Sequence, residues 1–303
     1  MDAATPSRTA MFCSLHRARH SRHDPKPLID DTWGDQLVPD SIRDLLFEFA
    51  LSTMDENARL LAMKSRETTL NDRMKASAAY CNAVLRCRYT EDMLEAAAAR
   101  GVDQYVVIGA GLDSFAVRRP PFARDMQVFE VDHPATQDFK LKRFRELGTA
   151  IPSSTHFASS DLSNEDIGSA LARTPYRSDR PAFFCWLGVT IYLTREANLD
   201  NLKAISWCAG PRSELVFTYF EQSVFGSTSN SEAFKRMQKL VASGGEPFIS
   251  GFDPFALGET LKRVGWNLLE DLDESEMLVR YDVDGENGMS PLAKSRFAHA
   301  RIL

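Results

Sequence analysis

The chain has little of what secreted, zinc-binding and membrane proteins carry. Its five cysteines include no CxxC pair and are odd in number, which disfavours both a disulfide framework and a zinc site. No apolar run is long enough to span a bilayer, and the first residues show no secretion-signal pattern. We therefore expect a cytoplasmic protein with reduced thiols, without a membrane partner and without a bound metal.

Excess positive charge is also missing. The 303 residues have a net charge of −6, which disfavours a nucleic-acid partner because such partners select basic surfaces. A content of 44% hydrophobic and 26% charged residues is typical of globular domains. The composition leaves a monomer and a homodimer equally open.

The first residues are an exception to this acidic balance. Basic side chains gather there, at Arg8, His16, Arg17, Arg19, His20, Arg22, His23 and Lys26. The three histidines have helical spacing, but no carboxylate or cysteine stands beside them to complete a metal site. We expect a solvated, partly mobile segment, and the alternative is an arm that closes over an anionic ligand.

The chain divides into a helical part and an alternating part. Residues 41–50 have apolar positions at helical spacing, with Asp40 or Ser41 as a possible cap, and a second helix over 82–100 stops at Gly101. We predict a helical cap or lid over residues 1–80 and a ligand-binding domain over 81–303.

Short apolar runs in the second part predict the strands of a sheet. They lie at residues 105–108, 127–131, 155–159, 182–187, 214–220, 266–271 and 296–302. Helical stretches between them, such as 135–147 and 195–207, predict an α/β, Rossmann-like doubly wound sheet of seven mostly parallel strands with an antiparallel last strand. The alternation breaks over about 222–252, which we interpret as an insertion after the fifth strand that forms part of a substrate lid.

The first strand runs into a glycine turn. Gly109 and Gly111 allow a sharp turn and a close approach of a ligand. A dinucleotide site would have a third glycine where Ser114 stands, and Asp113 would place negative charge beside phosphates. The turn therefore predicts a ligand without a diphosphate.

Acidic residues follow the next two strands. Asp132 ends the second strand, where a carboxylate can accept hydrogen bonds from both hydroxyls of a ribose, and Glu130 lies two residues earlier. Asp161 and Leu162 follow the third strand and suit an adenine amine and ring, although Asp161 alone also fits a helix N-cap. Arg86, on the helix before the first strand, can hold a carboxylate at two points, and the alternative is a solvated helix face.

Taken together, these stretches resemble the leucine carboxyl methyltransferase-like family of class I methyltransferases, in particular its bacterial branch associated with polyketide-type O-methylation. The matching residues, in family order and spacing, are 86–89, 104–114, 129–134, 161–162 and 186–193. The resemblance implies S-adenosyl-L-methionine as cofactor. The contacts expected for it are Arg17, Arg86, Gly109, Ala110, Gly111, Asp113, Glu130, Val131, Asp132, His133, Ser160, Asp161, Leu162, Leu187 and Gly188. Relatives commonly have Glu where this chain has Leu187, so a polar contact near the methionine amino group or the substrate is absent here.

The acceptor is less defined than the cofactor. A carboxylic acid is ionised at neutral pH and needs no base, whereas a phenol usually does, and no His or carboxylate of the sequence is placed as one. We therefore favour methylation of a carboxylate on a small secondary metabolite, with Tyr192, Tyr219 and Arg280 as positioning candidates. The alternatives are methylation of a hydroxyl, methylation of a protein C-terminus, an NAD(P)-dependent oxidoreductase, and a cofactor-binding protein without catalysis.

Overall fold

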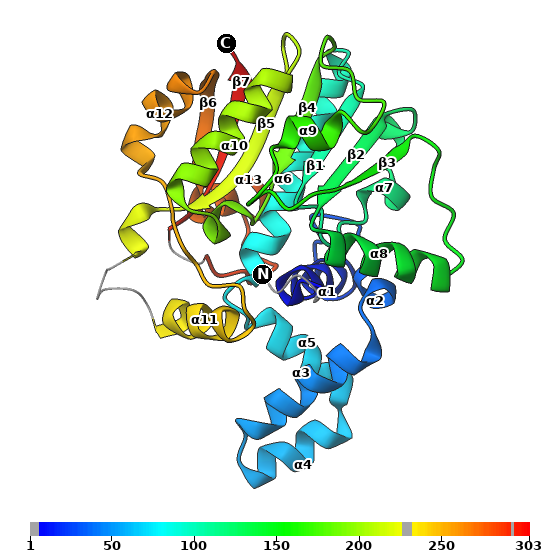
Figure 1. Cartoon of the computed structure of the whole chain (residues 1–303). Coiled ribbons are helices and arrows are strands. Elements are labelled where there is room, and N and C mark those ends of the chain that lie inside the picture. Colours follow the sequence, from blue (N-terminus) through cyan, green and yellow to red (C-terminus); the bar gives the residue numbers. More distant parts are fainter. Residues whose placement is uncertain (1–5, 226–231, 292–293) are drawn as a thin grey trace.

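A seven-stranded sheet forms the centre of the molecule, as the sequence predicted. The computed structural model describes residues 6–225, 232–291 and 294–303. The strands lie in the order β3-β2-β1-β4-β5-β7-β6, and the first five are parallel while β7 runs antiparallel to both β5 and β6 (Figure 1). The parallel strands therefore end at one common edge of the sheet, where a crevice is expected.

The strands agree with the apolar runs to within about two residues. They are β1 (Gln104–Ile108), β2 (Gln127–Asp132), β3 (Thr155–Ser159), β4 (Ala182–Trp186), β5 (Glu214–Phe220), β6 (Trp266–Asp273) and β7 (Ser295–Ile302). Every residue of β1 and β4 is buried, because helices cover both faces of the sheet.

Each face of the sheet has its own hydrophobic core. One face packs against α9 (Ile167–Leu171), α10 (Arg195–Cys208) and α12 (Leu257–Arg263). The other packs against α6 (Tyr80–Ala99), α7 (Phe115–Arg118) and α13 (Glu274–Tyr281). Helix α8 (Pro134–Glu146) follows β2, and short 3-10 helices join the remaining elements at η1 (Pro121–Ala123), η2 (Thr190–Tyr192), η3 (Gln222–Val224) and η4 (Pro254–Ala256).

The expectation of a solvated, mobile N-terminal segment is wrong. Residues Arg8–His23 form helix α1, in which eight residues are buried, among them Leu15, His16 and His20. Figure 1 shows α1 lying across the ends of the strands. Arg8, Arg22 and His23 of this helix are exposed, but Arg17 is buried because Asp31 neutralises it, with a carboxylate oxygen 2.7 Å from Arg17 Nε.

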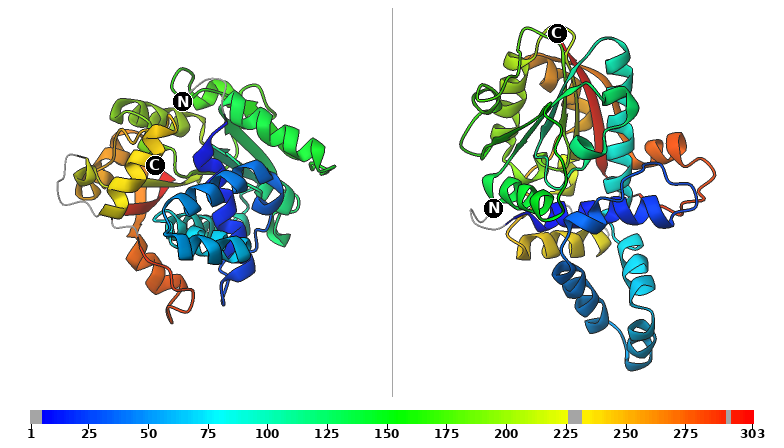
Figure 2. Two further views of the ribbon diagram at one scale, coloured as in Figure 1. Left: turned by 90° about the horizontal axis from the view of Figure 1, so that it is seen from below. Right: turned by 90° about the vertical axis from the view of Figure 1, so that its right-hand side faces the viewer.

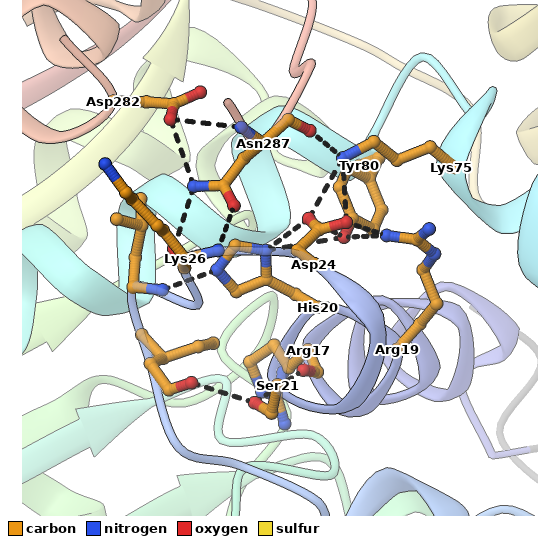
Figure 3. A network of polar contacts seen from close by, with 12 residues as sticks. Arg17, Arg19, His20, Ser21, Asp24, Lys26, Lys75, Tyr80, Asp282 and Asn287 are labelled. Carbon is orange, nitrogen blue, oxygen red and sulfur yellow. Dashed lines mark hydrogen bonds and ion pairs between the residues drawn. The ribbon is translucent and has the colours of Figure 1, made fainter. Parts of the chain in front are cut away.

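A polar network holds the C-terminal end of α1 (Figure 3). The Asp24 carboxylate accepts hydrogen bonds from Tyr80 Oη at 2.6 Å and Lys75 Nζ at 2.9 Å, and it also pairs with Arg19 and with His20 Nδ1 at 2.7 Å. His20 Nε2 accepts the Leu28 amide at 2.7 Å, so both nitrogens of this ring are engaged within the protein. The network joins α1 to α5 and α6.

Four further helices complete the N-terminal part. They are α2 (Gly34–Leu37), α3 (Asp40–Ser52), α4 (Glu56–Lys64) and α5 (Arg66–Lys75), and Figure 2 shows α3–α5 extending away from the sheet beyond α1. The cap predicted for α3 is wrong, because Pro39 precedes its first turn and no side chain accepts a hydrogen bond there. The division of the chain into two parts at residue 80 stays a prediction. In the structure the two parts are in contact, because α1 packs directly on α6.

The predicted insertion contains helix α11 (Glu232–Ser243) and then returns over the strand ends. Residues 226–231 of the insertion lie outside the described residues. Among the described helices, none is both long and apolar enough to cross a membrane.

Candidate active site

A cavity of about 300 Å³ lies at the C-terminal ends of the parallel strands. One part of it, the strand-end half, is lined from β1–β4 and α6 and includes Arg86, Gly109, Gly111, Asp132 and Asp161. The other part, the lid half, is lined from the start of α1, from η2 and from residues 245–249. Helix α1 and the insertion therefore cover what the strand ends leave open.

The glycine turn has the backbone that the sequence predicted. Gly109 has φ of 68° and Gly111 has φ of 52°, values that side chains other than glycine rarely adopt. A Cβ atom on Gly111 would lie 2.9 Å from the Cβ of Ala10 in α1, and one on Gly109 would lie 2.3 Å from a methyl group of Val189. The turn thus needs glycine for its conformation and for the close approach of the lid.

Asp132 joins the glycine turn to the end of β2. Its carboxylate accepts hydrogen bonds from the backbone N–H groups of Gly111 and, at 2.6 Å, of His133. Burial raises the pKa of Asp132, and the two backbone donors act against this rise. The carboxylate lines the cavity with lone pairs remaining for a ligand's hydroxyl groups.

Asp161 lies at the equivalent place after β3. It accepts hydrogen bonds from the Ser163 amide at 3.0 Å and from Asn164 Nδ2 at 2.7 Å. Burial alone would raise the pKa of Asp161, but these donors lower it. The N-cap alternative is wrong, because the next helix begins at Ile167 and is capped by Asp166. Leu162 and Ser160 line the same end of the cavity.

Arg86 enters the cavity from α6. Its Nη1 donates to Asn82 Oδ1 at 3.4 Å, and among the described residues no carboxylate lies within ion-pair distance of the guanidinium. Gly188, with φ of 69°, leaves space for the guanidinium of Arg86, since a Cβ atom on Gly188 would lie 2.3 Å from Arg86 Nη1. Arg88, by contrast, pairs with Asp92 at 3.0 Å. Arg86 therefore has donors available for an anionic ligand.

Arg17 lies in the cavity wall but is already engaged. Its Nε pairs with Asp31 at 2.7 Å, and its Nη2 donates to the Leu112 carbonyl at 2.8 Å. Burial would lower the pKa of Arg17, but its carboxylate neighbours, first Asp31, raise it. The side chain therefore holds the segment after the glycine turn in place.

The lid half contains a buried carboxylate that the sequence analysis missed. Glu246 lies between Gly245 and Pro247 and is 6% exposed. One carboxylate oxygen, Oε2, accepts a hydrogen bond from the Thr9 hydroxyl and one from the Thr9 amide at 3.4 Å, whereas Oε1 has no partner among the described residues. No pattern in residues 222–252 marks this glutamate.

Tyr192 lies beside Glu246 in the lid half. Burial raises the pKa of Tyr192, so its phenol stays protonated, and its ring packs at 5.8 Å from that of Phe248. The Ile249 amide donates to the Ile191 carbonyl at 2.7 Å and ties the insertion to η2. Further residues that line the lid half, and that were not among the predicted cofactor contacts, are Ser7, Thr9, Cys13, Leu193, Pro247 and Ile249.

Most of the predicted contacts meet in this cavity. Those that line it are Arg17, Arg86, Gly109, Ala110, Gly111, Asp113, Asp132, His133, Ser160, Asp161, Leu162, Leu187, Gly188 and Tyr192. Four candidates are not brought to it. Glu130 is buried against Lys140 at 2.5 Å, and Val131 lies in the core. Tyr219 donates to Asp271 at 2.8 Å, and Arg280 pairs with Glu270.

The strand-end half fits an adenosine ligand with a charged amino-acid tail. The available guanidinium of Arg86 matches a carboxylate, Asp132 matches a ribose, and Asp161 with Leu162 matches an adenine edge and face. Asp113, whose carboxylate accepts the Phe115 amide at 2.7 Å, lines the cavity beside the glycine turn. A diphosphate would meet this negative charge, so the arrangement favours a ligand without phosphates.

Comparisons with known proteins agree with this geometry. The leucine carboxyl methyltransferase family model matches residues 10–206. YktD of Bacillus subtilis (strain 168), which carries the name of an S-adenosyl-L-methionine-dependent methyltransferase, is 29% identical over 306 residues and covers 97% of either chain. A protein of Mycobacterium sp. (strain JLS) with the same kind of name is 31% identical over 208 residues, 67% of this chain and 64% of its own.

The fold also has a counterpart among solved structures. A crystal structure from Thermobifida fusca YX, described as that of a methyltransferase, has a TM-score of 0.59 and a sequence identity of 16%. The match covers 99% of this chain and 96% of that one.

Proposed function

This chain belongs to the leucine carboxyl methyltransferase family, and on that premise we propose that it transfers the methyl group of S-adenosyl-L-methionine to an oxygen atom of a small-molecule acceptor. It is an S-adenosyl-L-methionine-dependent methyltransferase. The observation that carries the proposal for the site is the convergence of Arg86, Asp132 and Asp161 on one cavity at three neighbouring elements.

Each end of the cofactor has a matching group in the strand-end half. Arg86 would hold the methionine carboxylate, Asp132 the ribose hydroxyls, and Asp161 with Leu162 the adenine. The bound sulfonium supplies an activated methyl group. The remaining work of the protein is to orient the acceptor oxygen in line with the methyl carbon and to exclude water. Helix α1, packed over the glycine turn at Ala10, supports the exclusion of water.

The small size of the acceptor is supported by the covered cavity. Residues of α1 and of the segment 245–249 close over the strand ends, which favours a small molecule over a protein C-terminus. The sequence favoured a carboxylate acceptor because no base was visible. Glu246 is a carboxylate that lines the cavity and could act as a base, so the absence of a base no longer favours a carboxylate acceptor. Carboxylate and hydroxyl acceptors therefore both stay within the proposal.

Two titrations and one assay test this function. We expect S-adenosylhomocysteine to bind in isothermal titration calorimetry and NAD to show no heat of binding. Tritium from S-[methyl-³H]adenosylmethionine should then appear on members of a panel of small carboxylic acids, phenols and alcohols. Binding of NAD without binding of S-adenosylhomocysteine would favour the oxidoreductase, and cofactor binding without transfer to any oxygen would favour a non-catalytic protein.

A further inference from the structure

The lid half of the cavity contributes none of the cofactor contacts proposed above for Arg86, Asp132, Asp161 and Leu162. The cofactor contacts proposed above come from α6 and from the ends of β1, β2 and β3. Tyr192, Glu246 and Ile249 line the cavity beyond β4, from η2 and from the insertion that follows β5. Since the strands run in the order β3-β2-β1-β4-β5, the residues of η2 and of the insertion lie on the β4–β5 side of the cavity, away from the contacts proposed for adenine after β3, and this side is left for the acceptor.

Glu246 is the charged group that distinguishes this side. It is 6% exposed, and its Oε2 is held by two hydrogen bonds from Thr9 while its Oε1 has no partner among the described residues. A buried carboxylate oxygen without a partner is unfavourable, so its retention beside a ligand cavity indicates that a ligand supplies the missing donor. These two hydrogen bonds to Glu246 both come from Thr9, an uncharged residue, so neither neutralises a carboxylate there.

The carboxylate of Glu246 favours one class of acceptor over another. With Arg86 engaged by the methionine carboxylate, an anionic acceptor would meet the like charge of Glu246 in a buried site. A neutral hydroxyl would instead donate a hydrogen bond to Oε1. The neighbouring Tyr192 cannot serve as the proton acceptor, because its own phenol is protonated.

We propose, on the basis of the O-methyltransferase function above, that Glu246 is the general base for a neutral alcohol or phenol acceptor. The acceptor O–H bond breaks and its proton passes to Oε1 of Glu246. The oxygen lone pair forms the new bond to the methyl carbon, while the carbon–sulfur bond breaks and leaves its electron pair on sulfur. Thr9 is a positioning residue that holds Oε2, so that Oε1 is the oxygen left without a partner among the described residues. The protonated carboxyl then loses its proton to solvent as the product leaves.

The first test separates an acceptor role from a cofactor role. Glu246→Gln keeps the shape of the side chain and removes its charge, and Glu232→Gln in the same insertion, where Glu232 is exposed and pairs with Lys235, is the matched control. We expect the affinity for S-adenosylhomocysteine, measured by calorimetry, to change less than about twofold in both variants. A loss of tenfold or more in Glu246→Gln alone would assign Glu246 to the cofactor and overturn the proposal while the proposed function stands.

The second test reads the acceptor class without the natural acceptor. Protein saturated with S-adenosylhomocysteine is titrated with 4-methylphenol and with 4-methylbenzoate by ligand-observed NMR. We expect the wild type to bind the phenol more tightly, and Glu246→Gln to gain about tenfold or more in affinity for the benzoate because the like charge is gone. A wild type that prefers the benzoate, or that binds neither probe at millimolar concentration, would overturn the proposal.

The third test measures the transfer itself. For any neutral phenol or alcohol methylated by the wild type, Glu246→Gln should lower kcat by about 100-fold or more, because the proton has lost its acceptor. The Glu232→Gln control should keep the wild-type kcat. Full kcat in Glu246→Gln, or a wild type that methylates only carboxylic acids, would refute the base and leave the O-methyltransferase function intact. Failure of the wild type to bind S-adenosylhomocysteine would refute the proposed function itself.

Discussion

The two halves of the cavity are built from different kinds of structure. The strand-end half uses residues at the ends of β1–β4 and a long helix, α6, and these elements pack into the two hydrophobic cores. The lid half uses the start of α1, a 3-10 helix and an insertion, which are held together by contacts such as that between Thr9 and Glu246. A rigid sheet can hold an unvarying cofactor, whereas loops can differ between relatives with different acceptors.

The largest effect on the strand-end half is expected from Asp132→Ala. The variant removes a carboxylate that would hold two ribose hydroxyls, and hydrogen bonds to charged groups contribute about 1.5–3 kcal/mol each. Affinity for S-adenosylhomocysteine should therefore fall more than about 100-fold in calorimetry. Far-UV circular dichroism should show an intact fold. Unchanged affinity would show that Asp132 does not hold the ribose, and the strand-end half could then no longer be assigned to the cofactor.

Arg86→Met should have the next largest effect. Without the guanidinium, the methionine carboxylate loses a charge-assisted pair, and affinity for S-adenosylhomocysteine should fall by about 10- to 100-fold. Arg88→Met is the matched control two residues away on α6, because Arg88 pairs with Asp92. Equal losses in the two variants would show that the helix surface, and not the cavity contact, accounts for the effect.

Asp24→Asn tests the anchor of α1, which covers both halves. Burial would raise the pKa of Asp24, but hydrogen bonds from His20, Tyr80, Lys75 and Arg19 lower it below its ordinary value. We expect the variant to lose about 2–3 kcal/mol of unfolding free energy in urea denaturation at pH 7, because the partly buried Arg19 and Lys75 lose their anionic partner. Asp284→Asn, which removes an exposed partner of Lys26, should change the unfolding free energy far less.

The lowered pKa of Asp24 also predicts the direction of a pH effect. Its contribution is fully present above the ordinary pKa of an aspartate, about 3.9, and is lost as the pH falls through the lower pKa of the folded state. Wild-type stability should therefore decline below about pH 4, and Asp24→Asn should show a shallower decline. Parallel curves for the two proteins would mean that other carboxylates account for acid unfolding.

The smallest effect on cofactor affinity is expected from Thr9→Val. This near-isosteric change removes the hydroxyl that holds Glu246 and should lower the unfolding free energy by about 1 kcal/mol. Affinity for S-adenosylhomocysteine should change less than about threefold, since Thr9 lies in the lid half. A tenfold loss would assign the start of α1 to the cofactor and shift the boundary between the halves.

The same contrast explains which predictions from sequence were confirmed. Buried strands are visible as local apolar runs, and residues directly after parallel strands must meet at one edge. The amino-acid sequence was therefore sufficient to predict that Gly109, Asp132 and Asp161 lie together. Tyr219 and Arg280 failed to reach the cavity. Tyr219 lies within β5 and donates a hydrogen bond to Asp271 of β6. No local sequence pattern indicates this partner.

The N-terminal helix shows where local inference ends. Its many basic residues are typical of solvated segments, and the burial of Arg17 is favourable only because Asp31, in the loop after the helix, pairs with it. Glu246 was missed for a related reason, because the insertion that carries it has no periodic pattern and its position depends on contact with Thr9, 237 residues away in the chain.

Short-range patterns in the amino-acid sequence thus determine the sheet, the glycine turn and the predicted cofactor contacts, because these depend on periodicity and on the common edge of parallel strands. It is the tertiary fold that makes α1 a buried cover and places a carboxylate in the lid half. Those features depend on partners that no periodic pattern indicates, Asp31 for Arg17 and Thr9 for Glu246, and the free energy of burying a charge is set by the partner that the fold brings to it.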